Sequence, residues 1–178
     1  MKLDNIIVSL DSLNSGDPND IIQSNISVIN LLKEEGAEES DMCDEALASY
    51  YVDYYLAQYN NGDFSQFVYN TGWDKELNDI VAKALKYIGA PKHLALFESL
   101  CARAETLNEE DLNAFLESDY FGDNPIRDTL NNASFYDLDE DIAALNSAWL
   151  RNHPKLLPLS IDDMYSRLEA FLGRPLDP

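Results

Sequence analysis

Carboxylates are the side chains of this sequence whose number and spacing could do chemistry. Seven of them lie in residues 34–45, EEGAEESDMCDE, without a Lys or Arg. The first acidic tract, residues 34–74, holds ten acids and no Lys or Arg; the second, residues 104–150, holds twelve acids and Arg127 as its single base. These two tracts carry the whole net charge of −21. Carboxylates at this density could bind divalent cations, act as general acids and bases, or imitate a row of phosphates.

The spacing of the acids argues against metal binding and catalysis. An EF-hand needs acids at alternating loop positions, a Gly at the sixth and a Glu at the twelfth, and DPND, NNGDF and DLDED lack that pattern. His93 and His153 stand beside no Ser or Cys motif, and no phosphate-binding glycine loop is present. Cys43 and Cys101 form no metal-type pair and are expected to be free thiols. We expect no active site, metal or cofactor; a hydrolase built on a carboxylate pair is the weakest alternative.

Helical spacing would place these carboxylates along one face. Side chains three or four residues apart on a helix lie about 5–6 Å from each other, as Glu38 would from Asp41, and Asp137 from Asp141. Duplex DNA carries one charge per ~1.7 Å of axis, so the net charge of −21 matches roughly 36 Å of duplex. From charge alone, a solvated acidic surface, an imitation of DNA and a surface for a basic protein all stay open. The acids expected to contact a partner are Glu34, Glu35, Glu38, Glu39, Asp41, Glu109, Glu110, Asp111, Glu117, Asp119, Asp123, Asp137, Asp139, Glu140 and Asp141.

The hydrophobic pattern predicts an all-α fold, because helix start and stop residues recur while the alternation typical of strands is almost absent. We expect a single compact domain of roughly eight or nine helices with an acidic surface, in which residues 1–36 form an N-terminal helical segment packed on a core of residues 37–178. No run of about 18 apolar residues or secretory signal is present, so a cytoplasmic protein without a membrane partner is expected. HPKLLPL (153–159) is predicted as a connector. The predicted helices span residues 18–36, from 40 or 41 to 62, 63–72, 75–89, from 91 onward, 109–118, 125–131, 138–152 and 161–172.

Turn residues and tyrosines predict how the middle of the chain is built. Asn60-Asn61-Gly62 is predicted as a left-handed helix stop, and Asp63 with Gln66 as a capping pair for the next helix. In the run YYVDYY, the face that carries Tyr50 and Tyr54 is predicted to enter the core with its hydroxyls at the rim. A tyrosine interface with a second subunit is the alternative.

One stretch resembles a known family. Residues 58–70, QYNNGDFSQFVYN, are similar to the N-G-G-F-x-Q-[FY]-[FV]-x-N motif of small acidic bacterial DNA-mimic proteins, and residues 82–90 resemble the A-x-A-L-x-x-I-G-A helix that follows it in that family. Asp63 departs from the motif, because the family usually has a second glycine there. The resemblance covers about residues 45–172. The matching positions are Asn61, Gly62, Phe64, Gln66, Phe67, Val68 and Asn70, followed by Ala82, Ala84, Leu85, Ile88, Gly89 and Ala90.

The resemblance implies an all-helical homodimer whose acidic surface imitates duplex DNA. Such a protein occupies the DNA-binding face of a helix-turn-helix transcriptional regulator, a basic protein, and keeps it off its operator without itself binding nucleic acid. The motif residues are expected to form a turn and part of the core, with no catalytic role. The alternative is an acidic adaptor or immunity-type protein that binds one basic partner without imitating DNA, so that DNA could bind at the same time.

Overall fold

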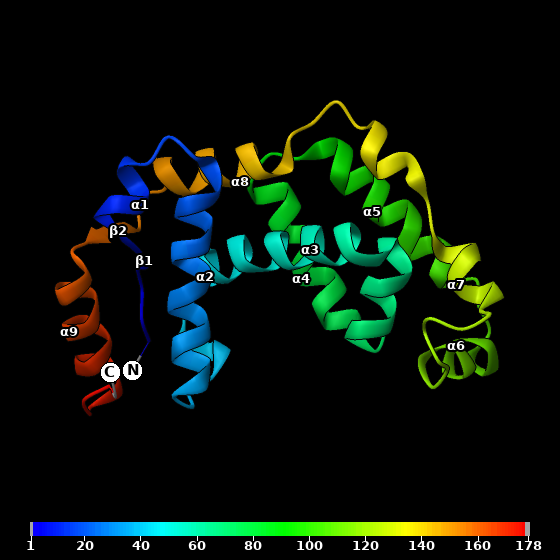
Figure 1. Ribbon diagram of the computed structural model, residues 1–178, viewed down its shortest axis with the longest axis horizontal. Helices are drawn as coiled ribbons and strands as arrows, with labels where there is room; N and C mark the ends of the chain where they lie inside the picture. The colour runs from blue at the N-terminus through cyan, green and yellow to red at the C-terminus, as the bar shows by residue number, and fades with distance from the viewer. Residues whose placement is uncertain (1, 177–178) are drawn as a thin grey trace. The chain divides into compact units, whose positions relative to one another are not determined.

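The computed structural model describes residues 2–176, of which most are helical (Figure 1). This confirms the all-α prediction, apart from one pair of short strands. No helix among these residues is long and apolar enough to cross a membrane. The α-helices are α1 (Leu10–Asn14), α2 (Pro18–Glu34), α3 (Asp44–Thr71), α4 (Lys75–Tyr87), α5 (Pro91–Ala104), α6 (Glu109–Leu116), α7 (Pro125–Leu130), α8 (Ile142–Asn152) and α9 (Ile161–Leu172); the 3₁₀ helices are η1 (Glu39–Asp41) and η2 (Ala133–Asp137).

Contacts divide the chain into two compact units. Unit 1 comprises the residues up to Tyr51 together with those from Ala143 onward, and unit 2 is the continuous segment Val52–Ile142. One division falls inside α3 and the other at the start of α8. The expected boundary at residue 36 lies within unit 1, where the N-terminal segment shares a hydrophobic core with residues of α8 and α9.

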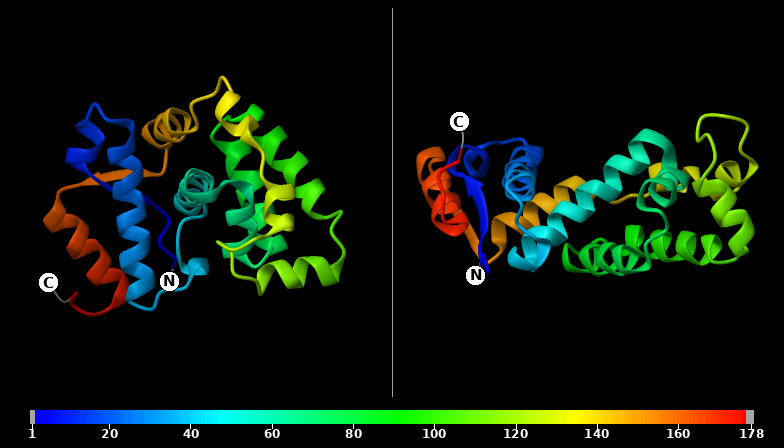
Figure 2. Two further views of the ribbon diagram at one scale, coloured as in Figure 1. Left: turned by 45° about the vertical axis from the view of Figure 1, so that its right-hand side comes forward. Right: turned by 90° about the horizontal axis from the view of Figure 1, so that it is seen from below.

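Unit 1 contains a parallel pair of strands, β1 (Ile6–Ser9) and β2 (Leu156–Leu159), with Ile6 opposite Leu156. Both α2 and α9 pack against β1 (Figures 1 and 2). Because Ile6, Ile7 and Val8 are all buried, β1 is a continuous apolar run without the alternation that reveals a half-exposed strand. Thus residues 153–159, predicted as a connector, contain a strand.

The core of unit 2 is aromatic. Tyr55 and Tyr59 are fully buried, and Tyr55 meets Phe67 and Phe97 edge to face at ring-centre distances of 6.0 and 5.2 Å. Burial raises the pKa of both phenols, so they stay neutral. The predicted face was wrong in part: the side chain of Tyr54 is only half-buried, and the neighbouring Tyr55 occupies the core instead. The periodicity of the tyrosine run fits either face, and packing against the two phenylalanines decides between them.

Helix ends follow the local sequence. Asp17 accepts from the Asn19 amide at the start of α2, Ser160 accepts from the Asp163 amide at the start of α9, and Gly89 ends α4 with φ 75°. Two helices begin later than predicted, because a 3₁₀ turn precedes each: η1 before α3, and η2 before α8. As expected, α4 and α5 pack against each other across the short turn that joins them.

Candidate partner-binding surface

The acids of residues 34–45 are largely engaged inside unit 1. Surface ion pairs of this kind contribute only about 0–1 kcal/mol each, but they neutralise charge that a partner would otherwise meet. Four of the seven carboxylates are paired in this way: Glu35 with Arg174, Glu39 with Lys33 (2.5 Å), Asp44 with Lys2 (2.7 Å) and Glu45 with Lys155 (2.7 Å).

Two further acids of this tract build a helix end. The side chains of Glu38 and Asp41 form a reciprocal capping box around η1. The Glu38 carboxylate accepts the backbone N–H of Asp41, and the Asp41 carboxylate accepts the backbone N–H of Glu38. The Tyr51 hydroxyl also donates to Glu39 Oε1 at 2.5 Å. Among the seven acids, only Glu34 has neither an ion pair nor a capping contact with the described residues. The first tract therefore serves the fold of unit 1 with most of its charge.

The acids of the second tract all lie in unit 2, and nearly all of them are exposed. Glu109, Glu110 and Asp111 form the first turn of α6, where the helix dipole favours negative charge and Asn108 caps the helix by accepting from the Asp111 amide at 2.8 Å. The other acids are spread over the rest of the tract: Glu105 follows α5; Glu117, Asp119 and Asp123 lie between α6 and α7; Asp128 lies within α7; Asp137 ends η2; and Asp139, Glu140 and Asp141 lie between η2 and α8. Figure 1 shows α6 and α7 beside each other, and these two helices are in contact.

Most carboxylates of the second tract have no cation near them. Asp128 pairs with Arg127 at 2.9 Å, and Asp139 lies 3.8 Å from Lys92 Nζ. Unit 2 as a whole has 18 acids against 6 Lys and Arg, a net charge of −12. Eight exposed carboxylates of the second tract, called the open acids below, have no Lys, Arg or His nitrogen of residues 2–176 within 4.0 Å: Glu105, Glu109, Glu110, Asp111, Glu117, Asp119, Asp123 and Asp137.

Glu140 has an internal role. Its carboxylate accepts the backbone N–H groups of Lys92 (3.1 Å) and His93 (3.0 Å) at the start of α5, where the N-cap residue Ala90 has no side chain to do so. The backbone oxygen of Glu140 lies 3.0 Å from Nε2 of the buried His93 ring. Glu140 was expected to contact a partner, and the structure shows that it holds the acidic segment onto α5.

A kink in α3 anchors the open acids to the core. At Gly62 and Asp63 the backbone leaves helical geometry. The Tyr120 hydroxyl lies 2.8 Å from both the Gly62 oxygen, to which it donates, and Ser65 Oγ. A Cβ on Gly62 would lie 2.7 Å from that hydroxyl and 2.2 Å from Gln66 Oε1, so a larger residue would displace both side chains.

The same kink holds the chain at three further points. The Asn132 amide donates to the Asp63 carboxylate at 3.2 Å, and the Ser65 amide donates to Asn131 Oδ1 at 3.2 Å. The Tyr69 hydroxyl donates to the Ser118 oxygen at 2.8 Å. The motif around residues 61–70 is thus the support of the acidic surface, and the prediction that it forms a turn and part of the core is consistent with these contacts.

Two details of the kink differ from the prediction. The left-handed backbone is at Asp63, with φ 66° and ψ −165°, whereas Gly62 is extended with φ −173°. Asp63 Oδ1 accepts the amides of Phe64 (2.5 Å) and Asn132, which lies far along the chain. The predicted capping pair with Gln66 is replaced by this tertiary contact.

An exposed aromatic side chain lies among the open acids. Phe121 is 88% exposed and lies between Asp119 and Asp123 in the sequence. Arg127 holds its loop by donating from Nη1 to the Tyr120 oxygen (2.8 Å) and the Gly122 oxygen (3.1 Å). The single base of the second tract therefore fixes the loop and pairs only with its neighbour Asp128. Sequence reasoning did not single out Phe121, although an aromatic residue within DYFGD was its signal.

The remaining reactive groups of unit 2 are His93, which is buried, and Cys101, which is partly buried. His93 is 2% exposed, and its ring packs on Phe135 with centres 4.8 Å apart. Burial, with the nearby Glu105, Glu98 and Asp79, raises the pKa of the Cys101 thiol to about 12. Both cysteines are free. Within residues 2–176, no three His, Cys, Asp or Glu side chains come together in a way that could hold a metal ion.

Comparison with known proteins places the chain in a family. Neither the curated proteins nor the solved structures contain a match to it. A family model does match: residues 40–153 fit that of the DMP19-like proteins, a DNA-mimic family. The match includes the kink, all the open acids and the whole of helices α3 to α8. It leaves out β1, α1, α2, β2 and α9. Because it covers well over half of the residues, the chain belongs to the DMP19-like family.

Proposed function

We propose that the protein is a DNA mimic whose open acids stand in for the phosphates of duplex DNA. The partner is a helix-turn-helix transcriptional regulator, whose DNA-binding face would be covered and whose operator would be displaced. The observation that carries the proposal is the difference between the two tracts: most acids of residues 34–45 are paired within unit 1, whereas the open acids of unit 2 have no cation. Membership of a DNA-mimic family supports it.

The amount of charge suits a short stretch of DNA. At one charge per ~1.7 Å of axis, eight carboxylates carry the charge of about 14 Å of duplex. Lys and Arg side chains that grip phosphates can bind carboxylates through the same charge-assisted hydrogen bonds. Because such contacts between exposed charges are screened over about 10 Å at 0.1 M salt, the complex should weaken as salt rises.

The test is capture of a regulator on the immobilised protein at low salt, followed by elution with its operator DNA. A regulator that is released by its operator, and whose gel-shift complex with that operator disappears when the protein is added, supports the proposal. A regulator that binds DNA and this protein together would contradict it.

A pair of matched variants locates the contact. The test variant neutralises four open acids, and the control neutralises four exposed acids elsewhere, so both have the same net charge. Inhibition of operator binding should be lost in the first and kept in the second, and circular dichroism should show equal helicity. Equal inhibition by both variants would show that the open acids are not the mimic. The test variant is E109Q/E110Q/E117Q/D123N, and the control is D4N/E76Q/E98Q/D162N.

Phe121 favours the second candidate, an acidic adaptor that binds a basic protein without imitating DNA. A phosphate backbone has no counterpart to an aromatic ring 88% exposed among carboxylates, whereas such rings are common anchors of protein interfaces. An adaptor would form a ternary complex with its partner and DNA, which the same gel shift would reveal as a slower band. The homodimer implied by the resemblance stays a prediction, to be checked by sedimentation equilibrium.

A further inference from the structure

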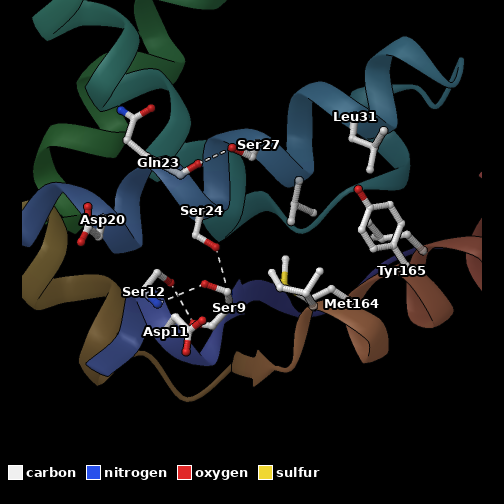
Figure 3. A pocket seen from close by; sticks show the side chains of 13 residues that line it. Ser9, Asp11, Ser12, Asp20, Gln23, Ser24, Ser27, Leu31, Met164 and Tyr165 are labelled. Atoms are coloured by element: carbon white, nitrogen blue, oxygen red, sulfur yellow. Dashed lines mark hydrogen bonds between the residues drawn. The ribbon is translucent and has the colours of Figure 1, made fainter. Parts of the chain in front are cut away.

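Unit 1 contains a groove between α2 and α9, beside β1 and α1 (Figure 3). Its volume is about 640 Å³, within the usual range of ligand pockets, about 300–1,000 Å³. Every residue that lines it lies outside the range 40–153 that matches the family model. The groove therefore lies outside the part of this chain that the family model covers.

One end of the groove is polar and acidic. Its serines bond to one another and to the backbone: the Ser9 amide donates to Ser24 Oγ at 2.8 Å, and Ser12 Oγ donates to the Ser9 oxygen at 2.8 Å. Asp11 and Asp20 lie at this end in Figure 3, and both are exposed. No Lys, Arg or His lines the groove, and the nearby Arg151 donates to the backbone oxygens of Ser12 and Ser15, so a cationic group at this end would meet two carboxylates that lack an ion-pair partner among residues 2–176.

The other end is apolar. Leu31 on α2 faces Met164 and Tyr165 on α9 (Figure 3). Tyr165 is 46% exposed, and Ile161, one turn earlier on α9, is 51% exposed. Two large apolar side chains four residues apart on one helix face make a stripe that water covers at a cost in free energy.

We propose that this groove binds a basic amphipathic helix of another protein. The apolar face of that helix would cover Leu31, Ile161 and Tyr165, and its Lys or Arg side chains would meet Asp11 and Asp20. A helix suits the groove better than a small amphiphile, because one amphipathic helix can cover the exposed apolar stripe of Ile161 and Tyr165 and also reach the exposed Asp11 and Asp20 at the other end. A second copy of this chain is a poor occupant of the groove, because a chain of net charge −21 offers no excess of Lys or Arg to meet Asp11 and Asp20.

A designed peptide provides the probe. A fluorescein-labelled 14-residue peptide of Leu and Lys, with Leu at helical spacing, is titrated with the full chain at 0.15 M salt by fluorescence anisotropy. Two peptides serve as comparisons: a scrambled one of the same composition, and one in which Glu replaces Lys. The amphipathic Leu/Lys peptide should bind about tenfold more tightly than the scrambled one, since only it presents an apolar stripe. Equal binding of these two would overturn the proposal.

Variants assign the binding to the groove. I161S/Y165S should weaken the peptide complex about tenfold, whereas Y87S, which removes an even more exposed tyrosine in unit 2, should leave it unchanged. D11N/D20N should weaken it more than D4N/E34Q, which makes the same change in charge. An I161S/Y165S chain that binds the peptide like the wild type would overturn the proposal. One-to-one binding of dodecylammonium without binding of the peptide would also overturn it, because a small amphiphile would then be the occupant. Self-association of the wild type that I161S/Y165S abolishes would overturn it as well, because the occupant would then be a second copy of the chain.

This site is independent of the proposed DNA mimicry, since it lies in unit 1 and the open acids lie in unit 2. I161S/Y165S should therefore still displace operator DNA from the regulator. If I161S/Y165S loses peptide binding but still displaces operator DNA, the groove has a function separate from DNA mimicry. If the wild type fails to displace operator DNA, the DNA-mimic proposal fails, and the result on peptide binding is unaffected.

Discussion

Asp63 carries a conformational cost that can be measured. Its backbone angles, φ 66° and ψ −165°, fall in a region that is essentially restricted to glycine, and a residue held there costs about 1–3 kcal/mol. The carboxylate offsets this cost by accepting the Asn132 amide at 3.2 Å; a hydrogen bond to a charged group contributes about 1.5–3 kcal/mol. The two effects are of similar size, so removing one without the other separates them.

Three substitutions make this separation. D63A keeps the strained backbone and removes the acceptor, so we expect a loss of about 2–3 kcal/mol in the free energy of unfolding. D63G also removes the acceptor, but it relieves about 1–3 kcal/mol of backbone strain. Glycine makes the unfolded chain more flexible, which costs about 0.4–1 kcal/mol of stability. D63G should therefore be more stable than D63A by about 1 kcal/mol. D63N keeps an oxygen acceptor and should lie nearest the wild type.

Urea unfolding followed by Trp73 fluorescence is the assay. Trp73 is buried in unit 2 with its ring 6.2 Å from Phe64, the residue after Asp63. The variants are made in a W149F background, because Trp149 belongs to unit 1 and the two units can unfold separately. D63A as stable as the wild type, or more stable than D63G, would refute the reasoning about the kink.

Three further predictions concern exposed and buried side chains. F121A should weaken regulator binding about two- to fivefold, by loss of a ring that can stack on a guanidinium, without changing the urea midpoint; an unchanged dissociation constant would exclude Phe121 from the interface. Burial opposes ionisation of Glu45, but hydrogen bonds from Lys155 and Cys43 outweigh it and lower its pKa to about 2. The contribution of Glu45 to the free energy of unfolding should be complete above the unfolded pKa near 4.5 and be lost as the pH falls toward 2. In urea unfolding, E45Q should therefore depend less on pH between these values than the wild type. An unaltered pH profile would argue against the pairing of Glu45 with Lys155. Cys101, with a pKa of about 12, should react with iodoacetamide at pH 8 far more slowly in the folded chain than in urea, as mass spectrometry would show; similar rates would mean that the thiol is accessible.

Local features of the fold could be predicted because their causes are local. A cap such as Asp17 or Ser160, or a Gly such as Gly89, sets a helix end through atoms a few residues away. The strand pair could not be predicted, because Ile6 meets Leu156 across 150 positions and the buried strand shows no alternation. Pattern alone therefore located helices and missed the sheet.

The candidate surface shows the same limit. Charge density along the sequence defines the two acidic tracts, but it does not tell which of their acids are paired in the fold. Glu35 pairs with Arg174, and the Glu140 carboxylate accepts from the backbone of α5; neither partner is near in the sequence. Such pairing depends on where distant cations and helix ends come to lie, which only the tertiary structure provides.

The parallel pairing of β1 with β2 has a consequence for the order of events during translation. Residues 6–9 leave the ribosome before unit 2 is made, whereas their partner strand, residues 156–159, is made only after it. Unit 2 is continuous in sequence, so its helices can condense while synthesis proceeds. Unit 1 must wait, and closing so large a loop makes its folding the slower step. In the nascent chain, the acidic surface of unit 2 can therefore be complete before the groove of unit 1 exists.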